Sequence, residues 1–126
     1  MLNMCLYSNL QLKDIPAIVD YIVKLIPNPD EKKEMRVRLI VEEYLTNVVK
    51  YGTTHSDVKT VSMFYCSDND SITFYDWGSE FDINAYAPKN ANGSSIGGHG
   101  IRLIKHYCKQ IKYNRDFNEN RTVIYL

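Results

Sequence analysis

Hydrophobic periodicity in this chain changes between helical and strand-like spacing, and these changes restrict the fold more than any other feature. Helices are predicted over residues 14–26 and 31–50, with Asp14 as the cap of the first and Gly52 as the end of the second. The side chains expected on their buried faces are Ile15, Ile18, Val19, Ile22 and Ile26, then Val37, Val41, Tyr44, Leu45 and Val48.

Two pairs of strands complete the pattern. Residues 58–66 and 71–76 alternate around a polar turn, and residues 110–115 and 121–126 alternate around residues 116–120. An opening strand over residues 3–10 and a helix over residues 100–108 are also predicted. This order predicts one domain, residues 1–126, of the α+β class: a two-layer α/β sandwich with helices on one face of a mainly antiparallel sheet.

Composition narrows the classes of function. Lys and Arg together number 15, as do Asp and Glu, so the formal net charge is zero. Proteins that bind nucleic acid directly usually carry a basic excess, so this balance argues against that partner. No apolar run approaches 18 residues and no charged-then-apolar leader is present, so a cytoplasmic protein without a membrane partner is expected.

Glu43 and Asn47 form the first candidate site. They are four residues apart in the second predicted helix, which places both side chains on one face. A carboxylate can accept a proton, and a carboxamide oxygen is a ligand suited to Mg²⁺. The alternative is a solvated helix face, because Glu42 lies directly beside Glu43.

Two further segments carry candidate chemistry. Asp76 ends a strand on its apolar face, where a carboxylate needs a partner, and Gly78 follows closely; the alternative is a simple turn. Residues 97–100 read Gly-Gly-His-Gly before a helix, whose free N–H groups favour phosphate, with Arg102 adding charge. The alternative for these glycines is a flexible hinge.

In this order, the three segments resemble the N, G1 and G2 boxes of the histidine-kinase-like ATPase superfamily, also called the GHKL or Bergerat fold. The run over residues 97–105, Gly-Gly-His-Gly-Ile-Arg-Leu-Ile-Lys, resembles the branch of anti-sigma-factor serine/threonine kinases. The resemblance extends from about residue 10 to the C-terminus. It implies the Bergerat ATP-binding fold, with ATP or ADP and Mg²⁺ as ligands.

The resemblance also implies a role for each matching residue. Asn47 would hold Mg²⁺, and Glu43 would be the catalytic base that activates the attacking hydroxyl. Asp76 would bind the adenine amine, and residues 84–97 would form the ATP lid. The other implied nucleotide-binding residues are Tyr51, Gly78, Gly98, His99, Gly100, Ile101, Arg102 and Thr122. Two positions depart from the family pattern, since Glu80 and Arg121 stand where glycines are usual.

As a function, the resemblance implies an ATP-binding anti-sigma regulatory factor with serine/threonine kinase activity towards a STAS-type anti-anti-sigma protein. A sigma factor would be its second partner, and a homodimer is a further expectation. The alternative is a nucleotide-binding interaction or switch module without effective kinase activity, which the two departures favour. The remaining alternatives are the catalytic fragment of a two-component histidine kinase and an α+β domain that binds no nucleotide.

Overall fold

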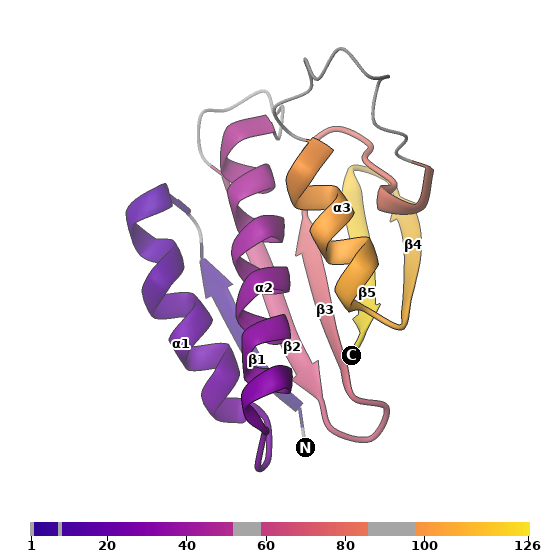
Figure 1. Ribbon diagram of the computed structural model, residues 1–126. Coiled ribbons are helices and arrows are strands. Elements are labelled where there is room, and N and C mark those ends of the chain that lie inside the picture. The colour runs from indigo at the N-terminus through magenta and orange to yellow at the C-terminus, as the bar shows by residue number, and fades with distance from the viewer. Residues whose placement is uncertain (1, 8, 52–58, 86–97) are drawn as a thin grey trace.

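The computed structural model describes residues 2–7, 9–51, 59–85 and 98–126. Five strands form an antiparallel sheet in the order β1-β2-β3-β5-β4, and three helices cover one of its faces (Figure 1). The strands are β1 (Leu2–Tyr7), β2 (Val61–Cys66), β3 (Ser71–Asp76), β4 (Gln110–Asp116) and β5 (Glu119–Tyr125). The helices are α1 (Ile15–Leu25), α2 (Glu31–Tyr51) and α3 (Gly98–Tyr107), with 3-10 turns at Leu12–Asp14 and Ile83–Ala85. The predicted two-layer α+β fold is confirmed.

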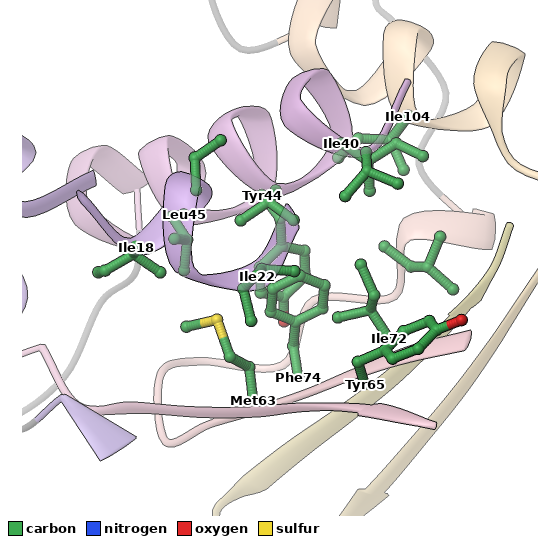
Figure 2. Close-up of a cluster of buried hydrophobic side chains, with 14 of the residues drawn as sticks. Ile18, Ile22, Ile40, Tyr44, Leu45, Met63, Tyr65, Ile72, Phe74 and Ile104 are labelled. Atoms are coloured by element: carbon green, nitrogen blue, oxygen red, sulfur yellow. The ribbon is translucent and has the colours of Figure 1, made fainter. Parts of the chain in front are cut away.

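The hydrophobic core lies between the helices and the sheet (Figure 2). All five side chains predicted for the buried face of α1 are buried, as are four of those on α2, while Val48 is partly buried. At the centre, Phe74 is fully buried and stacks on Tyr44 with 4.0 Å between ring centroids. Within the described part of the chain, no helix is long and apolar enough to cross a membrane.

The register of β3 and β5 decides which polar side chains face the helices. Phe74 pairs with Thr122, and Asp76 pairs with Asn120. Directly opposed residues in an antiparallel pair point to the same face of the sheet. Asp76 and Asn120 therefore lie on the same helix-covered face as Phe74.

Three local predictions need correction. Asp14 caps no α1 amide with its side chain; it ends the preceding 3-10 turn and its Oδ2 accepts a hydrogen bond from the Gln11 N–H at 3.0 Å. Helix α3 begins at Gly98, two residues earlier than predicted. The strands β4 and β5 extend into the predicted turn, because Phe117 adopts a positive φ of 55° that allows a tight connection. The predicted helix end at Gly52 lies outside the described residues.

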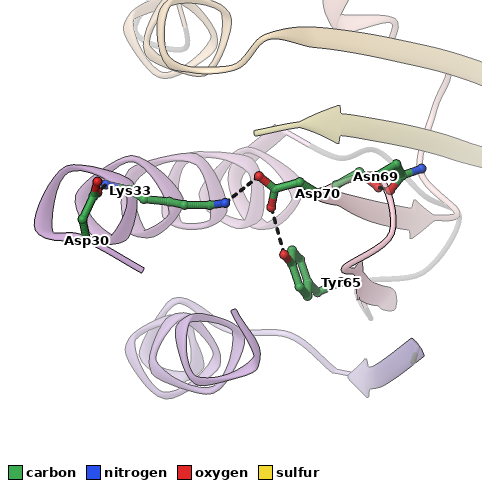
Figure 3. Close-up of polar contacts among 6 residues, drawn as sticks. Asp30, Lys33, Tyr65, Asn69 and Asp70 are labelled. Carbon is green, nitrogen blue, oxygen red and sulfur yellow. Dashed lines mark hydrogen bonds and ion pairs between the residues drawn. The ribbon is translucent and has the colours of Figure 1, made fainter. Parts of the chain in front are cut away.

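A polar cluster ties the β2–β3 turn to the start of α2 (Figure 3). Lys33 Nζ donates to Asp70 Oδ2 at 2.5 Å, and the Tyr65 hydroxyl donates to Asp70 Oδ1 at 2.9 Å. Burial raises the pKa of Asp70, but these two donors more than offset it and the pKa is lowered overall. The cluster lies at the end of β3 opposite to Asp76, so it anchors α2 without contacting the candidate site.

Candidate functional site

Helices α2 and α3 meet at the first candidate residues. Gly100 is buried, and a Cβ atom added there would overlap Glu43 Oε2 and lie 3.2 Å from Asn47 Nδ2. A glycine at this position therefore lets the first turn of α3 approach both side chains. The segments over residues 43–47 and 98–100, separate in the sequence, are brought together.

The two neighbouring glutamates have different environments. Glu42 is exposed, whereas Glu43 is half-buried beside α3. The pKa of Glu43 is raised, mainly because burial removes water from the carboxylate and secondly because of the negative charge of Glu42; Lys50 acts in the opposite direction. A carboxylate with a raised pKa is a better proton acceptor near neutral pH. Glu43 is therefore the glutamate suited to act as a base.

We expect Gly100→Ala to displace the Glu43 carboxylate rather than to unfold the protein. Oε2 ends a flexible side chain, and alanine in a helix is favoured over glycine by about 1 kcal/mol, which offsets part of the steric cost. A carboxylate pushed into water loses the desolvation that raises its pKa. The pKa of Glu43, measured by NMR titration, should therefore fall towards its ordinary value.

The exposed neighbour Arg102 provides the control for that experiment, since it is not among the groups that shift the pKa of Glu43. Arg102→Ala should leave this pKa unchanged. An unchanged pKa of Glu43 in Gly100→Ala would contradict the close contact between the two helices.

The amide of Asn47 has a defined orientation. Its Nδ2 donates to the Glu43 carbonyl oxygen at 2.7 Å, one turn earlier in α2. A carbonyl can only accept, so the nitrogen must point towards the helix and Oδ1 is the outward end. An outward carboxamide oxygen is a suitable Mg²⁺ ligand, so Asn47 fits the ion that the sequence resemblance implies.

The Asp76 carboxylate has the partners that its burial requires. Oδ2 accepts a hydrogen bond from the Tyr44 hydroxyl at 2.8 Å, and Oδ1 accepts from the Gly78 N–H at 3.1 Å and from Asn120 Nδ2 at 2.9 Å. The Tyr44 hydroxyl also lies 3.4 Å from Thr122 Oγ1. Burial, followed by the charge of Asp76, raises the pKa of Tyr44 well above its usual value, so Tyr44 stays a neutral donor.

Asn47 and Asp76 line the same pocket. Its wall is mostly apolar with a few polar groups, an arrangement common in small-molecule sites. The lining residues are Tyr44, Asn47, Val48, Asp76, Ser79, Phe81, Ile83 and Ile101. Three of these, Asn47, Asp76 and Ile101, are residues that the sequence predicts, and they come from three different elements.

The other predicted residues have different positions. Gly78 and Thr122 do not line the pocket but contact residues that do. The Gly78 N–H donates to Asp76, and Thr122 Oγ1 lies beside the Tyr44 hydroxyl, which itself donates to Asp76. Arg102 is exposed and does not line the pocket. Tyr51 lies in α2, and Gly98 and His99 lie in α3. Their predicted contacts with a nucleotide fall outside the described residues, as does the predicted lid beyond residue 85.

The two departures from the family pattern do not line the pocket. Arg121 lies on the outer face of the sheet, where its guanidinium is 5.9 Å from the Tyr75 ring. Glu80 is exposed between the lining residues Ser79 and Phe81. Neither side chain therefore occupies space in the pocket that a ligand would need.

Sequence reasoning missed several site residues. The helical pattern predicts only a core position for Tyr44, whereas in the structure its hydroxyl also donates to Asp76. The sequence pattern predicts a turn at Asn120, but the residue lies in β5 and its amide donates to Asp76. Among the wall residues, Phe81 belongs to the Phe81-Asp82 pair that resembles the anti-sigma branch, whereas Ile83 follows no regular spacing and the sequence held no signal for it.

The structure therefore shows a two-layer α+β domain with a pocket that Asn47 and Asp76 share. A family model described as the histidine kinase-like ATPase domain matches residues 11–126. The chain therefore belongs to the histidine kinase-like ATPase family, which confirms the predicted superfamily and supports ATP binding. A search among curated proteins found no match to the chain.

Proposed function

We propose that this protein is an ATP-dependent serine/threonine protein kinase that acts as an anti-sigma regulatory factor. The observation that supports it best is the meeting of Asn47 and Asp76 in one pocket, with Glu43 beside Asn47 on α2. Membership of the histidine kinase-like ATPase family supports ATP as the nucleotide that the pocket binds. The kinase branch is supported by the sequence over residues 97–105, and the phosphate acceptor would be a STAS-type anti-anti-sigma protein.

In the proposed complex, each end of ATP meets a group of matching chemistry. Asp76 accepts a hydrogen bond from the amine of the base, and the apolar wall that includes Ile101 contacts its ring. Asn47 Oδ1 is the protein ligand that would hold Mg²⁺, which when bound neutralises phosphate charge. The N–H groups at the start of α3 favour the phosphates.

Glu43 has the properties of the proposed base. Its raised pKa allows it to take the proton of a serine or threonine hydroxyl. The hydroxyl oxygen then attacks the γ-phosphorus, the bond to the β-phosphate oxygen breaks, and ADP leaves. Most of the catalysis in such transfers comes from positioning and charge neutralisation, so Glu43 supplies one part of the rate.

The proposed regulation links two partners. The unphosphorylated STAS-type protein would capture this protein and release the sigma factor, and phosphorylation would reverse that exchange. These partners and a homodimer come from the sequence resemblance and are consequences of the kinase branch. A cytoplasmic location, expected from the lack of a long apolar run, completes the proposal.

We expect Asn47→Ala to weaken Mg²⁺-dependent ADP binding by about 10- to 100-fold or more, since even outer-shell changes at metal sites cost this much. Calorimetric titration with ADP, with and without Mg²⁺, measures the effect. Asn114→Ala, which changes an exposed asparagine of β4, is the control and should bind like the wild type.

The same titration, combined with an assay of phosphate transfer, separates the proposal from its alternative. Absence of ADP binding in the wild type would refute the nucleotide site. Tight Mg²⁺-dependent binding without phosphate transfer to any STAS-type protein would favour the interaction or switch module over the kinase.

A further inference from the structure

The side chain of Asn120 is the most completely bonded polar group beside the pocket. It is 1% exposed. Its Nδ2 donates to Asp76 Oδ1 at 2.9 Å and to the Ser79 carbonyl oxygen at 2.8 Å. Its Oδ1 accepts from Arg115 Nη1 at 2.9 Å and from the Tyr113 hydroxyl. Both donors and both acceptor sites of the amide are therefore used.

These four partners define the orientation of the Asn120 amide. A carboxylate and a carbonyl can only accept from the nitrogen, and a guanidinium can only donate to the oxygen. A flipped amide would lose the two bonds of the nitrogen and oppose Arg115. Asn120 therefore always presents a donor to Asp76.

The donor from Asn120 makes the two oxygens of Asp76 unequal. Among the described residues, Oδ1 accepts two hydrogen bonds, from Gly78 and Asn120, whereas Oδ2 accepts one, from Tyr44. A carboxylate oxygen has about two acceptor sites. The remaining acceptor capacity of this buried group therefore belongs to Oδ2.

We propose that Asn120 is a positioning residue that directs Asp76 Oδ2 to the base and so sets the preference for a base with an amine over one with a carbonyl. This inference rests on the proposed nucleotide-binding function. It adds a residue of β5 to the site, and that residue contacts the nucleotide only through Asp76.

Asn120 also holds the wall of the pocket. Its bond to the Ser79 carbonyl fixes the segment after β3, and Arg115 Nη1, bound to the same amide, donates to the Gly78 carbonyl at 3.1 Å. Loss of binding in an alanine variant would therefore not separate positioning from structure. The test needs a readout that depends on the hydrogen-bonding character of position 120.

Asn120→Asp provides that readout through pH. The new carboxyl would face Asp76, and two carboxylates in contact retain one shared proton. That proton replaces the amide donor at low pH, and its loss at higher pH sets two negative charges against each other. Arg115 favours the charged form and the hydroxyls of Tyr44 and Tyr113 donate to the pair, whereas the two like charges oppose each other, so we expect the shared proton to be lost as the pH rises.

The measurement is the affinity for ADP with Mg²⁺ in the variant relative to the wild type at about pH 5, 6.5 and 8. The ratio removes the ionisation of the nucleotide itself. We expect Asn120→Asp to bind nearly as well as the wild type at the lowest pH and at least about 10-fold more weakly at the highest. Asn114→Asp, the same change on the exposed face of β4, should show a ratio independent of pH.

A second variant tests the proposal if Asn120→Asp does not fold, as judged by circular dichroism. In Asp76→Asn, the donor of Asn120 should direct the new amide oxygen inward and its nitrogen to the pocket. The wild type should prefer ADP over IDP, whose base carries a carbonyl in place of the amine, by about 10- to 100-fold. Asp76→Asn should reverse this preference.

The outcomes distinguish this inference from the function on which it rests. A folded Asn120→Asp variant whose affinity ratio does not change with pH would overturn the positioning role, as would an Asp76→Asn variant that still prefers ADP. A wild type that binds neither ADP nor IDP would overturn the proposed function as well.

Discussion

Glu43→Gln is expected to lower the rate of phosphate transfer by about 10²- to 10⁴-fold, the usual contribution of a general base. Glutamine keeps the size of the side chain and its contact with Gly100 but cannot accept the proton of the attacking hydroxyl. Binding of ADP with Mg²⁺ should change by less than about twofold, because the base acts on the transition state. Single-turnover transfer to a STAS-type protein and calorimetry measure the two quantities.

Glu42→Gln is the matched control for this experiment. Glu42 is the adjacent glutamate in α2 and is exposed, and its charge is only the second cause of the raised pKa of Glu43 after burial, so the same chemical change should lower the transfer rate far less than Glu43→Gln. Equal loss of binding and transfer in Glu43→Gln would contradict the assignment of the base. Equal rates for the two variants would contradict it as well.

Phe74→Ala is expected to lower the free energy of unfolding by about 3–5 kcal/mol. Phe74 is fully buried at the centre of the sheet and stacks on Tyr44, so its removal leaves a cavity between β3 and α2 (Figure 2). This loss is a large part of the about 5–15 kcal/mol by which domains are usually stable. Urea denaturation followed by circular dichroism measures it.

Tyr75→Ala serves as the comparison for the stability experiment. Tyr75 is the next residue of β3 and a similarly large ring, but it lies on the outer face of the sheet and is only partly buried. Its loss should cost clearly less than that of Phe74. Similar denaturation midpoints for the two variants would show that the core is not centred between α2 and β3.

Helix α2 contributes residues both to the hydrophobic core and to the candidate site. Tyr44 belongs to the core and supports Asp76, Glu43 lies at the contact with α3, and Asn47 faces the pocket. Helical geometry places Glu43 and Asn47 on one face of α2 and turns Tyr44 towards the core beside them. A change in core packing beneath Tyr44 is therefore expected to reach the pocket.

Local patterns were sufficient for the fold class and for part of the site. The spacing of apolar residues predicted both long helices, because an amphipathic helix repeats its pattern within a few turns. The pairing of Glu43 with Asn47 was predictable for the same reason, since both lie on one helix. Asp76 was identifiable because a carboxylate on the apolar face of a strand needs a partner.

The identity of those partners depended on the tertiary structure. Asn120 meets Asp76 because β5 pairs with β3 in one particular register, and a shift of one residue would turn it to the outer face. Arg121, the neighbour of Asn120, was expected to affect the site but points to that outer face.

The sequence by itself therefore determined the elements, their order and the chemistry available on α2 and β3, because these depend on residues close together in the chain. Only the tertiary structure decided that Gly100 contacts Glu43, that Ile101 shares a pocket with Asn47 and Asp76, and which oxygen of Asp76 keeps an acceptor site. The physical reason is that these contacts join distant segments, whose meeting depends on sheet register and helix packing.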